Sequence, residues 1–254
     1  MTDAEPMADE FDTMAGWTAD AVVELGPSHA IPAACRGSGS PAALRWLAAK
    51  LGLRPGMRLL DSGAGVGGPA ELAARWFQVT PVLAEPMISA CRASARLFGR
   101  PVVVAAGERL PFAAGVFDVA WSLGVLCTVE NQAGLLTELR RVTGPESPVG
   151  MLVFLRTVPQ LPEQPEGNHF LTAGELAELL AVTGLAVVEQ AELADFPAPE
   201  PEWQAAADQV EAMIKRTHGG DQRWQNAQRQ EQIISQLISE DLVAGRLLVL
   251  EHVR

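Results

Sequence analysis

The chain has 254 residues, of which 48% are hydrophobic, and a formal net charge of −12. This length fits one large α/β domain, or one domain with a sizeable insertion, and the hydrophobic content is enough for a core. The negative charge argues against nucleic acid, whose binding needs a basic face, and equally against an anionic membrane surface.

The first ten residues, M-T-D-A-E-P-M-A-D-E, are acidic and lack the apolar core of a signal peptide. No apolar run reaches the length that spans a membrane. The three cysteines lie far apart without metal-ligand spacing, so no metal site is predicted. These features together predict a reducing, cytoplasmic location.

The N-terminal region, residues 1–40, is predicted to be an acidic leader followed by a lid segment. The leader extends to about residue 14 and is expected to be mobile, and Trp17 to Ile31 are weakly helical in pattern. Ser40 and Pro41 then predict a helix start, because a capping hydroxyl precedes a proline at the first helical position.

Short apolar segments alternate with helical segments through the rest of the chain. Strands are predicted at residues 58–60, 79–84, 102–105, 117–123, 151–155, 185–189 and 246–253. Helices are predicted between them at residues 69–77, 88–98, 132–142 and 172–184. This alternation predicts βαβ units and a parallel sheet, in which ligands bind beyond the carboxyl ends of the strands.

Residues 197–241 interrupt this pattern with a polar, glutamine-rich segment of helical character. One interpretation is a solvated helical excursion that packs on the body, and another is a dimer interface. We predict a helical cap between strands six and seven that shapes the acceptor pocket, with the core formed by 41–196 and 242–254. The side chains expected to wall that pocket are large: Trp203, Met213 and Trp224.

The motif L-L-D-S-G-A-G-V-G-G-P-A begins at Leu59 and carries glycines at the spacing of a nucleotide-binding turn. Asp61 stands two residues before the first of them. A carboxylate there would repel a pyrophosphate by about 1 kcal/mol or more, whereas it would favour the ammonium and sulfonium of S-adenosylmethionine. Glu85, at the end of the second strand, suits ribose hydroxyls of either cofactor.

Four segments in register resemble class I S-adenosylmethionine-dependent methyltransferases, in the small-molecule branch that includes quinone-biosynthesis enzymes. They are L-L-D-S-G-A-G-V-G-G, L-A-E-P-M, E-R-L-P-F-A-A-G-V-F-D-V-A-W-S and L-T-A-G-E-L-A-E-L-L-A-V-T-G-L. Together they span about residues 40 to 190. The resemblance implies an α/β fold with a Rossmann-like, doubly wound, mostly parallel sheet of seven strands and an antiparallel last strand. It also implies methyl transfer to a small or medium organic acceptor, such as a secondary metabolite, quinone or glycoside.

The same resemblance assigns the cofactor contacts. Asp61, Gly63 and Gly65 would line the methionine part, Glu85 would hold the ribose, and Met87 would lie against the adenine.

The two later loops add further expected contacts. The family often has an aspartate where this chain has Ala106, so Gly107 and Glu108 are expected to serve the adenine instead. Ser122 and Leu123 would touch the methionine part.

The catalytic base is less well defined. Cys127 stands where many relatives carry a histidine, and it is interpreted as a small buried residue. His169 and His29 are the candidate bases, although methyl transfer needs mainly proximity and alignment of the acceptor. Arg36 could meet a carboxylate of cofactor or substrate.

Two alternatives remain open from the sequence. One is a protein of the same fold that binds S-adenosylmethionine without methyl transfer, and the other is a nicotinamide-dependent oxidoreductase. A homodimer is left open as well.

Overall fold

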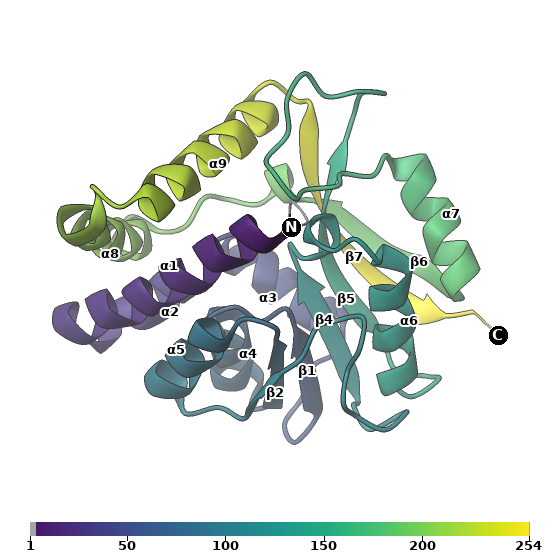
Figure 1. Cartoon of the computed structure of the whole chain (residues 1–254). Helices are drawn as coiled ribbons and strands as arrows, with labels where there is room; N and C mark the ends of the chain where they lie inside the picture. Colours follow the sequence, from purple (N-terminus) through teal and green to yellow (C-terminus); the bar gives the residue numbers. More distant parts are fainter. Residues whose placement is uncertain (1–3, 254) are drawn as a thin grey trace.

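A computed structural model describes residues 4–253 as a central sheet with helices on both faces (Figure 1). The strands are Arg58–Ser62 (β1), Thr80–Glu85 (β2), Val102–Val104 (β3), Val119–Leu123 (β4), Val149–Arg156 (β5), Leu185–Glu192 (β6) and Val243–His252 (β7). Their order in the sheet of seven strands is β3-β2-β1-β4-β5-β7-β6. Strand β7 runs antiparallel to both β5 and β6, while β1 to β5 pair in parallel. The predicted fold class is therefore confirmed.

The helices of the core also match the sequence prediction closely. They are Pro41–Lys50 (α3), Gly68–Phe77 (α4), Ile88–Phe98 (α5), Gln132–Val142 (α6) and Ala173–Thr183 (α7), with short 3₁₀ turns at Pro27–His29 (η1), Leu126–Thr128 (η2) and Leu193–Asp195 (η3). The Ser40 hydroxyl accepts from the backbone of Ala43, as predicted for a helix cap. Thr172 and Glu175 form the predicted capping box at the start of α7.

Two hydrophobic cores lie on opposite faces of the sheet. Leu59 belongs to the core under α3 and α4, whereas its neighbour Leu60 belongs to the core under α6 and α7. Consecutive residues of a strand point to opposite faces, so a strand buried on both sides reads as a continuous apolar run. The order of strands reverses between β1 and β4, and their carboxyl ends form the crevice where ligands collect in such sheets.

The N-terminal region differs from the prediction. Residues 1–3 lie outside the described residues, and a helix, Ala4–Leu25 (α1), occupies most of the segment expected to be a leader. Met14, Trp17 and Ala21 follow one another at helical spacing and pack on the insertion. That apolar stripe explains why an acidic segment is helical. A short helix, Ala30–Ala34 (α2), follows it.

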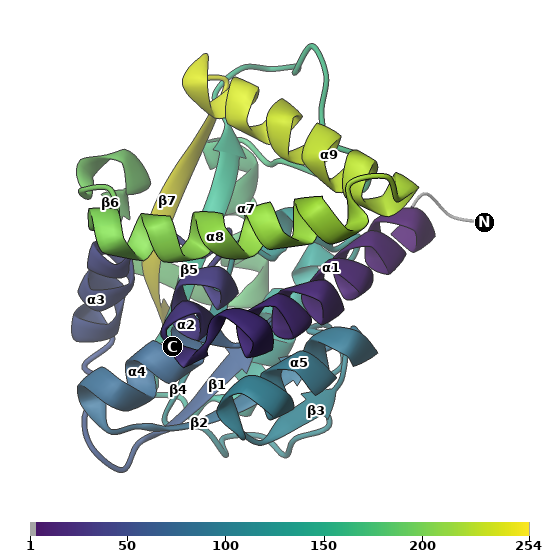
Figure 2. The same cartoon turned by 90° about the vertical axis from the view of Figure 1, so that its left-hand side faces the viewer.

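The insertion contains two helices, Pro201–His218 (α8) and Gln222–Ser239 (α9). Figure 2 shows α8 lying along α1, with α9 beside both, and α8 also contacts α2. Met213 and Trp224 are buried in one hydrophobic cluster with Met14 and Val22 of α1. The expectation that Met213 and Trp224 wall an acceptor pocket is therefore wrong, because their side chains hold the insertion to α1.

Candidate cofactor site and acceptor side

The glycine turn after β1 makes the carboxyl edge of the sheet accessible to a ligand. Gly63 donates its N–H to the carbonyl of Ala84 at 2.8 Å, and it has a positive φ of 74°. A Cβ on Gly63 would overlap the Val125 side chain, whereas one on Gly65 would meet no atom within 4 Å. Gly63 is therefore required by packing, and Gly65 leaves its backbone open to close approach.

The end of α2, within the segment predicted to be a lid, packs closely on the third glycine of the motif. A Cβ on Gly68 would lie 2.6 Å from the carbonyl carbon of Ala34 and 2.8 Å from the nitrogen of Cys35. A Cβ on Gly124, after β4, would lie 3.0 Å from the carbonyl oxygen of Gly37. The turn that follows α2 thus crosses the ends of β1 and β4. The sequence predicts a lid here, but it does not indicate that Gly68 and Gly124 are needed to seat it.

Asp61 is a buried carboxylate with spare hydrogen-bonding capacity. Its side chain is 2% exposed, and Oδ2 has no hydrogen-bond partner among the described residues. Burial raises the pKa of Asp61 to about 7; the nearby Trp121 indole opposes that rise, and the charge of Glu85 adds to it. The Trp121 N–H has no acceptor in hydrogen-bond geometry within residues 10–253, so it does not satisfy Oδ2. A buried anionic acceptor without a partner suits a ligand that brings a cationic donor.

Glu85 is organised by the backbone around it. Its Oε2 accepts the N–H of Gly65 at 2.8 Å, and its Oε1 accepts the N–H of Met87 at 3.0 Å. Burial raises the pKa of Glu85, and these two N–H groups oppose that rise. Each carboxylate oxygen retains a lone pair, so the side chain can still accept from ligand hydroxyls. The Met87 side chain is half-buried at the start of α5.

The Asp12 side chain of α1 hydrogen-bonds to the start of α5 and so connects the N-terminal region to the segment that follows Glu85. Its Oδ1 accepts from the backbone N–H of Ser89 at 2.5 Å and of Ala90 at 3.3 Å, while Oδ2 accepts from the Ser89 hydroxyl at 2.9 Å. Asp12 thereby caps α5 from a different helix, directly after the Glu85 to Met87 segment. The sequence gives no signal of this contact, because local capping patterns do not extend over 77 residues.

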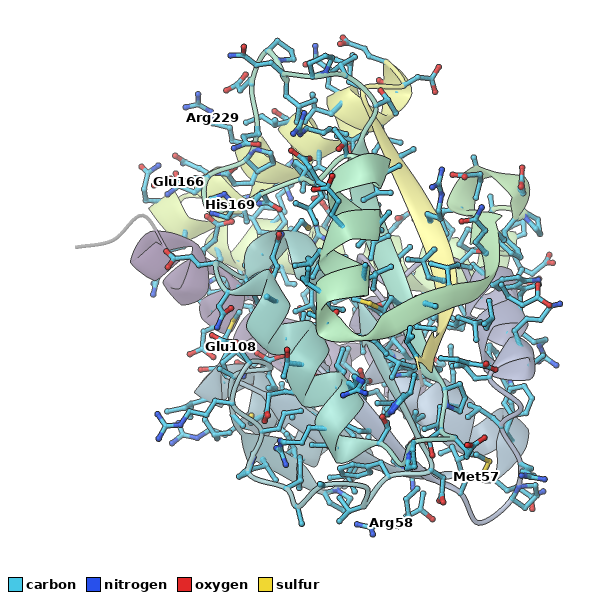
Figure 3. The ribbon with its side chains drawn as sticks, turned by 90° about the vertical axis from the view of Figure 1, so that its right-hand side faces the viewer. Met57, Arg58, Glu108, Glu166, His169 and Arg229 are labelled. Atoms are coloured by element: carbon cyan, nitrogen blue, oxygen red, sulfur yellow. The ribbon has the colours of Figure 1, made fainter. Side chains whose placement is uncertain are left out.

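The loop after β3 closes the other side of the crevice. A Cβ on Gly107 would lie 2.6 Å from Leu135 and 3.1 Å from the Ser62 hydroxyl, which has no partner among the described residues. Glu108 is half-buried next to Gly107 (Figure 3). The predicted adenine-side residues therefore stand at the same edge as Asp61 and Glu85, beside an unpartnered hydroxyl.

Ser122 and Leu123, which were predicted to touch the methionine part of the cofactor, are the last two residues of β4 and make different contacts. The Ser122 hydroxyl donates to the carbonyl of Ser62 at 3.0 Å and so links β4 to β1. Leu123 is buried in the core under α3 and α4. Because the Ser122 hydroxyl is hydrogen-bonded within the sheet, a ligand at this position would contact the backbone and not that hydroxyl.

The two candidate histidines do not come together. His29 accepts or donates at Nε2 with Gln209 of α8 at 2.9 Å and lines a groove of about 600 Å³ between the lid and α8. The His169 side chain is exposed, and Figure 3 labels its position. Its backbone N–H donates to the Cys127 carbonyl at 2.6 Å, and its carbonyl accepts from the Gln132 side chain at 3.0 Å. The ring nitrogens of His29 contact Ser28, Gly26 and Gln209, not Asp61 or Glu85, and a catalytic role for either histidine stays a prediction.

An apolar cluster lies between η2, β5, β7, α9 and the loop after β5. We call it the η2–α9 cluster, and it comprises Cys127, Phe154, Leu161, Phe170, Ile233, Leu237, Leu242 and Val243. Burial raises the pKa of the Cys127 thiol to about 12, which agrees with its interpretation as a space-filling residue. Arg36 forms an ion pair with Glu231 of α9 and is thus engaged within the chain.

Two further searches concern only the described part of the chain. No three His, Cys, Asp or Glu side chains there lie close enough together to hold a metal ion. Among the same residues, no helix is both long and apolar enough to cross a lipid bilayer.

Residues 60–151 match the family described as "Methyltransferase domain". The chain contains a methyltransferase domain. This domain holds the glycine turn, Glu85, and the loops after β3 and β4, so the predicted family resemblance is confirmed for this part of the chain, although the quinone-biosynthesis branch is not singled out.

Known proteins resemble the methyltransferase domain and the whole fold. Cycloartenol-C-24-methyltransferase 1 of Oryza sativa subsp. japonica is 31% identical over 108 residues, which cover 39% of this chain and 31% of that protein. The chain therefore spans about a third of the length of that curated relative.

Solved structures resemble the fold over most of the chain. The [4+2]-cyclase SpnF has a TM-score of 0.70 and 19% identity, covering 94% of this chain and 95% of that one. The mycolic acid cyclopropane synthase CmaA1, complexed with SAH (S-adenosylhomocysteine) and CTAB, has a TM-score of 0.64 and 15% identity, covering 82% of each chain. At these identities the likeness is one of fold.

Proposed function

We propose that the protein transfers a methyl group from S-adenosylmethionine to a small organic acceptor. The observation that carries this proposal is the Asp61 carboxylate, which is buried beside the glycine turn with one oxygen unpartnered. In a pyrophosphate site such a group would repel the ligand, whereas the ammonium of S-adenosylmethionine supplies the missing donor. The methyltransferase domain match over residues 60–151 supports the same choice.

The residues of the crevice suit the rest of this cofactor. Glu85 retains acceptor capacity for ribose hydroxyls, and Gly65 leaves its backbone open to close approach. Gly107 and Glu108 stand on the side proposed for the adenine, and the unpartnered Ser62 hydroxyl adds a polar group there. When bound, the cofactor supplies an activated methyl carbon, and the protein's own contribution is to hold an acceptor in line with it and to exclude water.

Calorimetry and isotopic transfer test this proposal. We expect S-adenosylhomocysteine to bind, and NAD⁺ to show no binding at the same concentration. Labelled methyl from S-adenosylmethionine should appear in an apolar fraction of a metabolite extract, identified by its mass shift. NAD⁺ binding without S-adenosylhomocysteine binding would favour the oxidoreductase alternative.

A second candidate function uses the same fold without methyl transfer. We keep it as the alternative because a structure named as a [4+2]-cyclase shares the fold over nearly the whole length of both chains. Here S-adenosylhomocysteine would bind, but no labelled methyl would leave the cofactor with any acceptor.

The domain bounds, the cellular location and the oligomeric state are also proposals. We propose that residues 1–40 act as the lid segment, 41–196 and 242–254 as the core, and 197–241 as the cap. We also propose a cytoplasmic protein, on the grounds of its scattered cysteines, and the net charge of −12 argues against a nucleic acid partner. A homodimer is tested by light scattering coupled to gel filtration.

A further inference from the structure

Two buried side chains on neighbouring strands, Asp61 of β1 and Trp121 of β4, each leave a polar atom without a hydrogen-bond partner. Their Cα atoms are paired in the register between the two strands. Paired residues of neighbouring strands lie about 5 Å apart and point to the same face of the sheet. Leu59, two residues before Asp61, packs with Trp121 in the core under α3 and α4, which identifies that face.

The indole of Trp121 lies next to the Asp61 carboxylate without bonding to it. Trp121 is 1% exposed and Asp61 is 2% exposed. Neither the indole Nε1 nor the carboxylate Oδ2 has a hydrogen-bond partner within residues 10–253. A donor and an acceptor that are buried side by side and remain unbonded both lose the hydrogen bonds that water would give them. A structural role alone does not explain this arrangement, whereas a ligand that binds both atoms does.

The pair lies at the carboxyl edge of the sheet, close to the turn that follows α2. Burial raises the pKa of the Cys35 thiol at the end of α2, and the charge of Asp61 raises it further, so the two side chains are near each other. Cys35 also packs in the same core as Trp121. The unpartnered atoms are therefore beside the glycine turn that the proposed function assigns to the cofactor.

The charges around the pair determine which part of a ligand each atom binds. Strand β1 lies between β2 and β4, so Glu85 at the end of β2 and Trp121 lie on opposite sides of Asp61 (Figure 1). Asp61 and Glu85 offer acceptors, which suit an ammonium and hydroxyls, whereas the indole N–H is only a donor. A ligand carboxylate would be repelled by Glu85 and is favoured on the Trp121 side.

The sequence had suggested Arg36 as the partner of a carboxylate on the cofactor or the substrate. In the structure, Arg36 forms an ion pair with Glu231 of α9, and its side chain is 44% exposed. The donor next to Asp61 is instead the indole of Trp121.

We propose that Trp121 is a cofactor-binding residue whose indole N–H donates to the carboxylate of the amino-acid part of S-adenosylmethionine, while Asp61 accepts from its ammonium. This inference rests on the proposed function. The ammonium and the carboxylate are attached to one carbon atom of the cofactor, so they can reach neighbouring atoms on two adjacent strands. Together, the two side chains select ligands that carry an intact amino-acid group.

The central test measures the affinity of three ligands by calorimetry: S-adenosylhomocysteine, its analogue without the carboxylate and its analogue without the ammonium. Trp121→Phe keeps an aromatic ring but removes the N–H. We expect it to weaken binding of S-adenosylhomocysteine by about 10-fold, as for the loss of a hydrogen bond to a charged group. Binding of the decarboxylated analogue should change by less than about twofold, because that analogue has no group for the indole to bind.

Asp61→Asn should give the complementary pattern. It should weaken both ligands that carry the ammonium, and the deaminated analogue should bind at least as tightly as to the wild type, because a like charge is removed. Trp46→Phe is the matched control, since it removes a partly buried indole that packs against the same core and contacts Phe196 and Lys50. It should leave the relative affinities of the three ligands unchanged.

NMR on the wild type provides a readout that does not depend on the folding of Trp121→Phe. Nitrogen-15 labelling of the six tryptophans gives one indole N–H signal for each. Phenylalanine variants of the other five tryptophans assign the Trp121 signal by elimination. We expect this signal to move downfield when S-adenosylhomocysteine binds and to move less with the decarboxylated analogue, because only the first ligand offers a carboxylate to the N–H.

Each failure has a distinct meaning. Equal losses for S-adenosylhomocysteine and the decarboxylated analogue in Trp121→Phe would show that Trp121 acts through packing or through Asp61, and would overturn its assignment to the carboxylate. An indole signal that responds equally to both ligands would overturn it as well. Absence of S-adenosylhomocysteine binding to the wild type contradicts the proposed function itself, and the inference with it.

Discussion

Two regions of this molecule are held together by different kinds of contact. We call the glycine turn with β1, β2 and Glu85 the cofactor half, and α1, α2, α8 and α9 the lid half. In the cofactor half, backbone hydrogen bonds set the geometry: Gly63 bonds to Ala84, and Gly65 bonds to the Glu85 carboxylate. In the lid half, large side chains interlock, as in the stack of Trp17 on His218 with ring centroids 4.0 Å apart. We therefore expect backbone changes at the glycines to affect the cofactor half most, and side-chain changes to affect the lid half most.

The largest expected effect of a single change falls on the lid half. Trp224 is 4% exposed and packs with Met14, Val22 and Met213. Trp224→Ala should lower the free energy of unfolding by about 3–5 kcal/mol, because it removes a large buried side chain from this cluster. Urea unfolding measures it, and Val182→Ala, at a residue that is 80% exposed, should change stability by less than about 0.5 kcal/mol. A Trp224→Ala protein as stable as the Val182→Ala control would show that side-chain packing does not hold the lid.

In the cofactor half, the largest expected effect is on binding. Asp61→Asn keeps the shape of the side chain but removes its charge, so the affinity for S-adenosylhomocysteine should fall by about 1–3 kcal/mol, the range for a hydrogen bond between charged groups. Calorimetry measures the affinity, and Asp208→Asn on the exposed face of α8 serves as the control. Equal affinities in both variants would contradict the assignment of Asp61 to the ammonium.

The contact between the two halves can be weakened alone. Asp12→Ala removes the cap that α1 gives to α5, which should cost about 1 kcal/mol of stability. Hydrogen exchange should increase in the first turns of α1 and α5, while the β1 and β2 amides keep their protection. If Asp12→Ala increased hydrogen exchange equally in both halves, the two halves would open as one unit, which would contradict this prediction.

The smallest effect is a pH dependence of cofactor binding. The folded-state pKa of Asp61, about 7, lies above its ordinary value of 3.8. Its contribution to the free energy of unfolding is therefore greatest below the ordinary pKa and is lost as pH rises toward 7. A bound ammonium favours the ionised form, so affinity should rise by about threefold between pH 6.5 and 7.5. Calorimetry at both pH values measures this, and a flat response in Asp61→Asn with the slope kept in Asp208→Asn would assign the proton to Asp61.

Local patterns were sufficient to predict most of the core. The apolar segments around Leu60 and Trp121 predicted buried strands, and the Thr172 to Glu175 pattern predicted the start of α7, because periodicity and capping are short-range properties. The residues around the glycine turn were predicted for the same reason, since Asp61, Gly63 and Gly65 are neighbours in the chain. Whether they and Glu85 bind S-adenosylmethionine stays a prediction.

The packing of α1 against α8 and α9, and the surroundings of the two candidate histidines, could be found only from the tertiary structure. The acidic start of the chain gave no strong pattern, and α1 is helical because Met14 and Trp17 find partners in α8 and α9, about 200 residues away. The histidines had the right chemistry, but folding placed His29 against α8 and left His169 exposed. Short-range patterns determine strands, caps and turns, while long-range packing determines which side chains face the acceptor.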